Sequence, residues 1–128
     1  MHPGIEALKR AHDHWNAGDV EGYLELYRED FVIHGLQGVG KGREGFRAFC
    51  EGYRAAFADC AFDIDDVFAA GDKVTMRFTG RVRLVSGREL TFPGITILRF
   101  EGDKCVERWS QADFMSLLQE MGVLPRPN

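Results

Sequence analysis

The chain has 128 residues, the usual size of a single domain, and we expect one domain over residues 1–128. Apolar residues make up 45% and charged residues 28% of it, an ordinary balance for a soluble globular protein with its own core. The net charge of −4 argues against nucleic acid or an anionic membrane as a partner, because both are bound by clusters of Lys and Arg.

The cysteines and the start of the chain indicate where the protein is found. Cys50, Cys60 and Cys105 are odd in number, widely spaced and set in apolar segments, which favours reduced thiols. The first residues show no secretory signal, and no apolar run approaches the roughly 20 residues that span a bilayer. We therefore predict a cytoplasmic location.

The first half of the chain has the spacing of helices. Apolar side chains recur every three or four residues over 4–18 and again over 43–57. Asp19 can cap a short helix between them, with Val20, Tyr23, Leu24 and Tyr27 on its apolar side. Residues 31–34 have the composition of a short strand, which the Gly-rich residues 35–42 end.

After residue 60 the period changes from 3.6 to 2, which predicts strands. Residues 61–70 form an irregular strand with a bulge near Asp65, and regular strands are expected over 73–85, 88–100 and 104–111. Helices followed by such an antiparallel meander are typical of an α+β fold in which the helices cover one face of the sheet.

Alternation within residues 73–85 predicts which side chains face the helices. Met76 and Phe78 are expected to face inward, and Arg77 and Arg81 outward. The outward arginines either bind an anion or form cross-strand ion pairs, and such rows more often do the latter.

The sequence patterns argue against a metal or a cofactor. Residues 35–41 have the spacing of a phosphate-binding P-loop, but Gly42 stands where a P-loop needs a hydroxyl. His12 and His14 are two residues apart on a helix, so their side chains diverge, and the chain has no Cys-x-x-Cys or His-x-x-x-His pair. No serine lies in a Gly-x-Ser-x-Gly elbow, which disfavours a serine hydrolase. We predict neither metal nor cofactor.

The order of these elements resembles the nuclear-transport-factor-2-like fold. Residues 106–122 (VERWSQADFMSLLQEMG) are similar to the last strand and helix of SnoaL-like proteins, a group that includes polyketide ester cyclases. Residues 15–19 (WNAGD) and 30–34 (DFVIH) resemble the same group. The resemblance implies a curved antiparallel sheet packed on N-terminal helices, a cystatin-like α+β roll, around a conical pocket for a small apolar organic ligand.

The resemblance also implies catalytic positions, and this chain departs from them. The cyclases are thought to use an Asp on the last strand and a His on the strand before it, and these positions hold Ser110 and Thr96 here. Ketosteroid isomerases of the same fold have a base at the end of the first strand and a carboxylic acid on the fourth. In this chain the base position falls near His34 or Gly35, and the acid position is Thr96. Neither Ser nor Thr exchanges a proton near neutral pH as a carboxylate or imidazole does.

Other residues remain as candidates for chemistry. His34 ends the first strand, His12 lies on the apolar side of the first helix, and each is either a titrating group in the pocket or a core-edge histidine. Arg108 shares strand parity with Ser110, so it either carries a positive charge into the pocket or pairs with a carboxylate. Asp113 is a weaker candidate acid, because its position favours the N-cap of the last helix.

Two functions fit these candidates. In the first, His34 is the base of a cyclisation or isomerisation on a hydrophobic carbonyl compound, and Arg108 or Ser110 stabilises the oxyanion. In the second, the protein is a non-catalytic binding module for a small apolar ligand. Both use the same expected pocket residues: His12, Trp15, Phe49, Tyr53, Met76, Phe78, Phe92, Thr96 and Ser110. A homodimer is expected through the outer face of the sheet, where Trp109 and Ile97 point away from the pocket.

Overall fold

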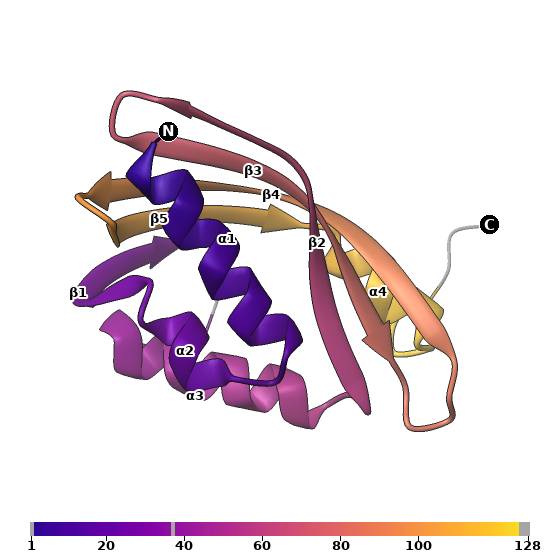
Figure 1. Cartoon of the computed structure of the whole chain (residues 1–128). Coiled ribbons are helices and arrows are strands. Elements are labelled where there is room, and N and C mark those ends of the chain that lie inside the picture. Colours follow the sequence, from indigo (N-terminus) through magenta and orange to yellow (C-terminus); the bar gives the residue numbers. More distant parts are fainter. Residues whose placement is uncertain (1, 37, 126–128) are drawn as a thin grey trace.

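The computed structural model describes residues 2–36 and 38–125, and it has the expected α+β architecture (Figure 1). The helices are α1 (Pro3–Asn16), α2 (Val20–Leu24), α3 (Gly42–Ala55) and α4 (Phe114–Glu120). The strands are β1 (Tyr27–His34), β2 (Asp59–Ala70), β3 (Lys73–Arg83), β4 (Glu89–Glu101) and β5 (Lys104–Ala112). None of the described helices is long and apolar enough to cross a membrane.

The start of β1 differs from the prediction. Asp19 does cap α2, since its carboxylate accepts a hydrogen bond from the Gly22 N–H at 2.9 Å. However, α2 ends at Leu24 and Tyr27 is the first residue of β1, so its predicted place on the helix is wrong. Tyr27 is extended because this part of the chain pairs with β5. Tyr27 lies opposite Cys105, and the N–H of Cys105 donates a hydrogen bond to the carbonyl of Leu26 at 2.8 Å.

The five strands form one mixed sheet in the order β1-β5-β4-β3-β2. Strands β2 to β5 are the predicted antiparallel meander, and the predicted bulge lies between Ile64 and Asp66. At the other edge β1 runs parallel to β5, so the expectation of a wholly antiparallel sheet is wrong there. The chain leaves β1 through α3 and crosses to the opposite edge, so no hairpin imposes an antiparallel neighbour on β1.

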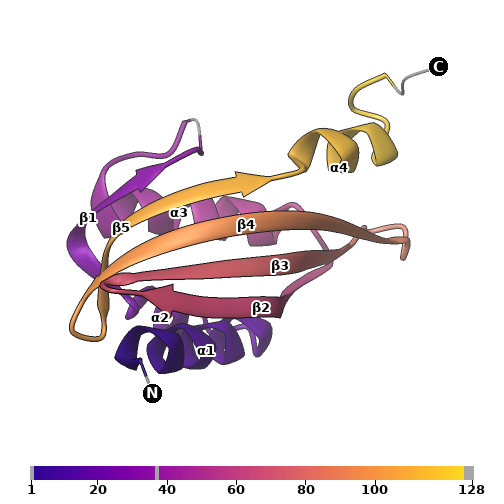
Figure 2. The same cartoon turned by 90° about the horizontal axis from the view of Figure 1, so that it is seen from above.

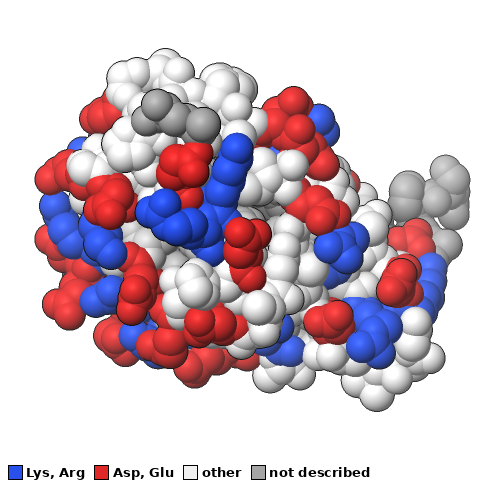
Figure 3. Space-filling model, viewed as in Figure 1, with Lys and Arg blue, Asp and Glu red and all other residues white. Residues whose placement is uncertain are grey.

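The long strands curve around the helices, and the core lies between the two layers. Figure 1 shows α1 lying across the sheet with α2 and α3 beside it, and Figure 2 shows α4 beyond the end of β5. The predicted faces of β3 are confirmed, because Met76 and Phe78 are buried while Arg77 and Arg81 are exposed. The two arginines form cross-strand ion pairs with Asp66 and Asp63. On the helix side, acidic and basic residues are interspersed without a large patch of one sign (Figure 3).

Candidate functional site

A cavity opens between the helices and the concave face of β3, β4 and β5. Eight of the nine expected pocket residues line it: His12, Trp15, Phe49, Tyr53, Met76, Phe78, Phe92 and Ser110. The ninth, Thr96, is fully buried opposite Ser110 in the pairing of β4 with β5, and their hydroxyl oxygens are 3.4 Å apart. Whether these residues bind a ligand stays a prediction.

Aromatic rings make this cavity narrow and largely apolar. Its enclosed part has a volume of only about 50 Å³ for the centre of a water-sized sphere, within an empty space of about 560 Å³ that includes the open mouth. Wall residues outside the nine expected ones include Tyr23, Phe46 and Phe62, and α4, which follows β5, contributes Phe114. The ring of Phe114 lies 5.3 Å from that of Phe92, so α4 covers part of the cavity.

Arg108 enters the cavity from β5 and is held by three hydroxyl groups. Its Nε donates to Ser110 Oγ at 2.7 Å. Its Nη1 donates to the hydroxyls of Tyr23 at 2.9 Å and Tyr27 at 2.5 Å. The guanidinium also lies over the ring of Phe46, 5.3 Å from its centroid. These contacts fix the orientation of the charge.

The charge of Arg108 has no carboxylate partner, so the alternative of an ion pair is wrong. None of the ion pairs among residues 2–36 and 38–125 includes Arg108. Burial acts to lower the pKa of Arg108, but Tyr23 and Tyr27 outweigh it and raise that pKa. Burial also raises the pKa of both tyrosines, although the Arg108 charge opposes this, and both stay neutral at neutral pH. The cavity therefore contains a fixed positive charge.

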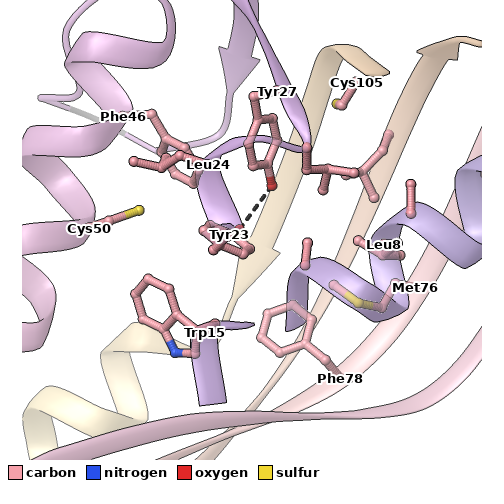
Figure 4. Packing of buried hydrophobic residues seen from close by; sticks show 14 of the residues in the cluster. Leu8, Trp15, Tyr23, Leu24, Tyr27, Phe46, Cys50, Met76, Phe78 and Cys105 are labelled. Atoms are coloured by element: carbon pink, nitrogen blue, oxygen red, sulfur yellow. Dashed lines mark hydrogen bonds between the residues drawn. The ribbon is translucent and has the colours of Figure 1, made fainter. Parts of the chain in front are cut away.

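Hydrogen bonding around Arg108 leaves donors for a ligand. The hydroxyls of Tyr23 and Tyr27 are 2.9 Å apart, shown by the dashed line in Figure 4, and both accept from Nη1. One hydroxyl donates to the other, which leaves one O–H hydrogen without a partner among these groups. Tyr23 lines the cavity, and Nη2 of Arg108 makes no hydrogen bond to a described residue. Both groups can donate to a ligand oxygen.

His12 supplies a neutral base in the same cavity. Its Nδ1 lies 3.1 Å from the carbonyl oxygen of Leu8, which only accepts, so Nδ1 carries the hydrogen. Burial, helped by the charge of Arg108, lowers the pKa of His12 to about 4. The ring is therefore neutral at neutral pH, and Nε2 has a free lone pair and no hydrogen-bond partner among the described residues. His12 can accept a hydrogen bond or a proton from a ligand.

His34 lies outside the cavity, so the prediction that it points inward is wrong. Its side chain is exposed on the outer face of the sheet, where Nε2 lies 2.8 Å from Glu107 and the ring stacks on Trp109. Strand parity explains this, because Phe31 and Ile33 face the core and His34 therefore faces outward. We do not retain His34 as a candidate base.

Asp113 is the N-cap of α4, as its position favoured. The carboxylate accepts hydrogen bonds from the backbone N–H of Ser116 at 3.0 Å and from its hydroxyl at 2.6 Å. These hydrogen bonds lower the pKa of Asp113, which lies at the surface and outside the cavity wall. Its interactions account for a structural role, and we do not assign it a catalytic one.

Tyr23 and Tyr27 are the functional candidates that the sequence did not reveal. The sequence offered a carboxylate as the partner of Arg108, whereas the structure supplies phenol hydroxyls. The signal available was the four-residue spacing of the two tyrosines next to an apolar segment, which alone indicates core packing. In the described part of the chain, no three His, Cys, Asp or Glu side chains gather in a way that could hold a metal ion.

Comparison with known proteins identifies the family. The family model of SnoaL-like polyketide cyclases matches residues 5–121, while a comparison with curated proteins found no match. A proposed polyketide cyclase from Bacillus cereus ATCC 10987 is 26% identical with a TM-score of 0.85, over 95% of this chain and 82% of that one. IdmH, a proposed polyketide cyclase from Streptomyces antibioticus, is 24% identical with a TM-score of 0.84, over 95% of this chain and all (100%) of that one. AclR, a proposed hydroxylase from Streptomyces galilaeus, shares the fold at 22% identity and a TM-score of 0.84, over 97% and 83% of the two chains. With its fold and nearly its whole length matched, this chain belongs to the SnoaL-like polyketide cyclase family.

Proposed function

We propose that this protein binds a small hydrophobic carbonyl compound in the cavity and catalyses a proton transfer on it. The observation that carries the proposal is that a neutral histidine and a guanidinium without a carboxylate partner line one apolar cavity. Carbonyl chemistry of this kind needs both a base for the proton and a donor for the oxygen. Membership of a family named for polyketide cyclases supports the same class of reaction.

The step begins with His12 and ends on the oxygen held by Arg108. Nε2 of His12 takes a proton from the carbon next to the carbonyl, and the C–H electron pair moves to the oxygen as an enolate. Nη2 of Arg108 and the hydroxyl of Tyr23 donate to that oxygen. In an isomerisation the imidazolium returns the proton to another carbon of the conjugated enolate. In a cyclisation the enolate carbon attacks a second carbonyl carbon of the same ligand, the π pair of that C=O moves to its oxygen, and the imidazolium returns the proton to this oxygen.

The low pKa of His12 fits this role only when the ligand becomes anionic. A pKa of about 4 makes the free imidazole a weak base. An enolate beside it would favour the protonated ring and offset the repulsion from Arg108, so the pKa rises as the proton is transferred. The base thus gains strength during the step in which it is needed.

A non-catalytic binding module is the second candidate. The same pKa of about 4, together with Ser110 and Thr96 at the family's acid and base positions, favours it. In this case the cavity holds an apolar ligand through its aromatic wall, and Arg108 and His12 orient the polar end.

Proton exchange on a simple ketone separates the two candidates. We expect the protein to accelerate deuterium uptake into 2-tetralone in D2O, followed by NMR, and His12→Gln to lower the rate by about 10²–10⁴-fold. His34→Ala is the matched control, because His34 lies outside the cavity, and its rate should equal that of the wild type. Saturable binding of 2-tetralone without faster exchange would reject catalysis in favour of the binding module.

A further inference from the structure

Two further polar groups in the cavity wall have no hydrogen-bond partner. They are Nε1 of Trp15 and the hydroxyl of Tyr53, and both atoms are buried without a bond to a described residue. Unpaired buried donors cost folding free energy, and most proteins avoid them. Two of them beside one cavity indicate that a ligand supplies the missing acceptor.

The rings of the two residues pack in one aromatic cluster with Tyr23, whose hydroxyl accepts from Arg108. The ring of Trp15 is 5.1 Å from that of Tyr23 and 6.1 Å from that of Tyr53, between centroids. In the view of Figure 4 the indole nitrogen lies on the side of the ring away from Tyr23. Arg54 holds the indole from α3, since its guanidinium lies 4.7 Å from the ring centroid and donates to the Trp15 carbonyl. The indole is therefore held in place, and its N–H takes no part in the hydrogen bonds around Arg108.

We propose that Trp15 and Tyr53 form a second polar subsite, which binds a neutral acceptor oxygen of the ligand such as a carbonyl. The inference rests on the proposed function in that the same cavity holds the substrate, whose first oxygen lies at Arg108. An indole N–H only donates, so this subsite selects an acceptor. The expected substrates are thus slender, largely apolar compounds with two oxygen-containing groups. The group at Arg108 is anionic or becomes anionic in the reaction, and the group at Trp15 and Tyr53 is neutral.

The subsite predicts opposite effects of one substitution on stability and on binding. Burial raises the pKa of Tyr53, so its hydroxyl stays protonated as a donor. Tyr53→Phe removes a buried donor that is unpaired in the free protein, so the melting temperature should stay equal or rise. The same substitution should weaken the binding of a ligand that has an acceptor at this position.

Isothermal titration calorimetry with two probes of similar shape tests the subsite. 4-Acetylbenzoate carries a carboxylate for Arg108 and a carbonyl for Trp15 and Tyr53, whereas 4-isopropylbenzoate lacks the carbonyl. We expect the wild type to prefer the acetyl probe by about 2–10-fold, the value of one neutral hydrogen bond, and Tyr53→Phe to lose most of this preference. Tyr23→Phe is the matched control, because it removes a hydroxyl at the Arg108 end and should weaken both probes alike.

The outcomes separate this inference from the catalytic proposal. A wild type that binds both probes equally, or neither, would overturn the subsite. So would a Tyr53→Phe variant that keeps the full preference, whatever its melting temperature. If the preference disappears in Tyr53→Phe while 2-tetralone shows no enzyme-catalysed exchange, the subsite stands and the catalytic proposal falls.

Discussion

Arg108 determines what the cavity can bind, because its charge is held by neutral groups alone. Removing a guanidinium from water is costly unless its hydrogen bonds and its charge are both compensated. Ser110, Tyr23 and Tyr27 accept the hydrogen bonds of Nε and Nη1, but none of them is negative at neutral pH. A ligand with negative charge or an incipient oxyanion therefore gains more here than a neutral one.

His12 makes stability depend on pH. Its pKa is about 4 in the folded protein and 6.5 in the unfolded chain, so only the unfolded state binds the proton between these values. The stability is fully present above pH 6.5 and is lost as the pH falls through this range. We expect His12 to reduce the free energy of unfolding by about 2 kcal/mol at pH 5 relative to pH 7.5.

Urea unfolding of the wild type and of His12→Gln at both pH values measures this loss. Carboxylates titrate alike in both proteins, so the difference between their pH dependences isolates His12. The same pH dependence in both proteins would mean that His12 is protonated as easily when folded as when unfolded.

Single residues show what the sequence could predict about the site. Strand and helix parity placed most of the cavity wall, and the same parity applied to Phe31 and Ile33 would have placed His34 outside. The partners of Arg108 could not be predicted in this way. A long side chain reaches many positions, and Tyr27 meets it only because β1 begins earlier than its apolar pattern indicates.

At the scale of elements, β3 and β4 shape the cavity through two reciprocal pairs of Gly and Phe. Phe78 lies opposite Gly94, and Gly80 lies opposite Phe92. A Cβ added at either glycine would stand 2.3 Å from the Cζ atom of the facing ring. Each ring thus lies over a glycine, which leaves the space in front of it for the cavity.

Gly94→Ala should therefore narrow the cavity and destabilise the sheet. The added methyl group displaces Phe78 into the cavity, at a cost of about 1–3 kcal/mol. Gly52→Ala in α3 is the control, because its Cβ meets no atom within 4 Å and should stabilise the helix by about 0.5–1 kcal/mol. Denaturant unfolding and the binding of 4-acetylbenzoate measure both effects, and an unchanged affinity in Gly94→Ala would show that Phe78 does not move into the ligand's space.

The elements that depend on neighbouring residues could be predicted from the sequence, whereas the pairing of distant strands could not. Helix periods, the Asp19 and Asp113 caps and the bulge near Asp65 depend on neighbours in sequence, and the structure agrees with each of them. The parallel pairing of β1 with β5 joins segments more than 70 residues apart, with α3 and the strands β2 to β4 between them in the chain. No local pattern encodes which edge of the sheet such a strand joins.

At the scale of the whole molecule, the outer face of the sheet is partly apolar although none of the described helices covers it. One cross-sheet row contains His34, Trp109, Ile97, Thr75 and Phe68, and exposed Ile95 lies in the next row. Ion pairs border this surface, among them Arg99 with Glu107 and Arg77 with Asp66. An apolar centre with a polar rim is the usual anatomy of a protein interface.

We expect this face to join two copies of the chain as a homodimer. A two-fold axis would stack the apolar rows of both copies and bury Ile95 and Ile97, which are 51% and 36% exposed in the single chain. Ile95→Asp should place two carboxylates at the interface and shift the protein to a monomer in sedimentation equilibrium. Val85→Asp is the control, because Val85 is 89% exposed in the turn between β3 and β4, away from this face. A wild type that sediments as a monomer at high concentration, or an Ile95→Asp variant that stays dimeric, would remove this face as the interface.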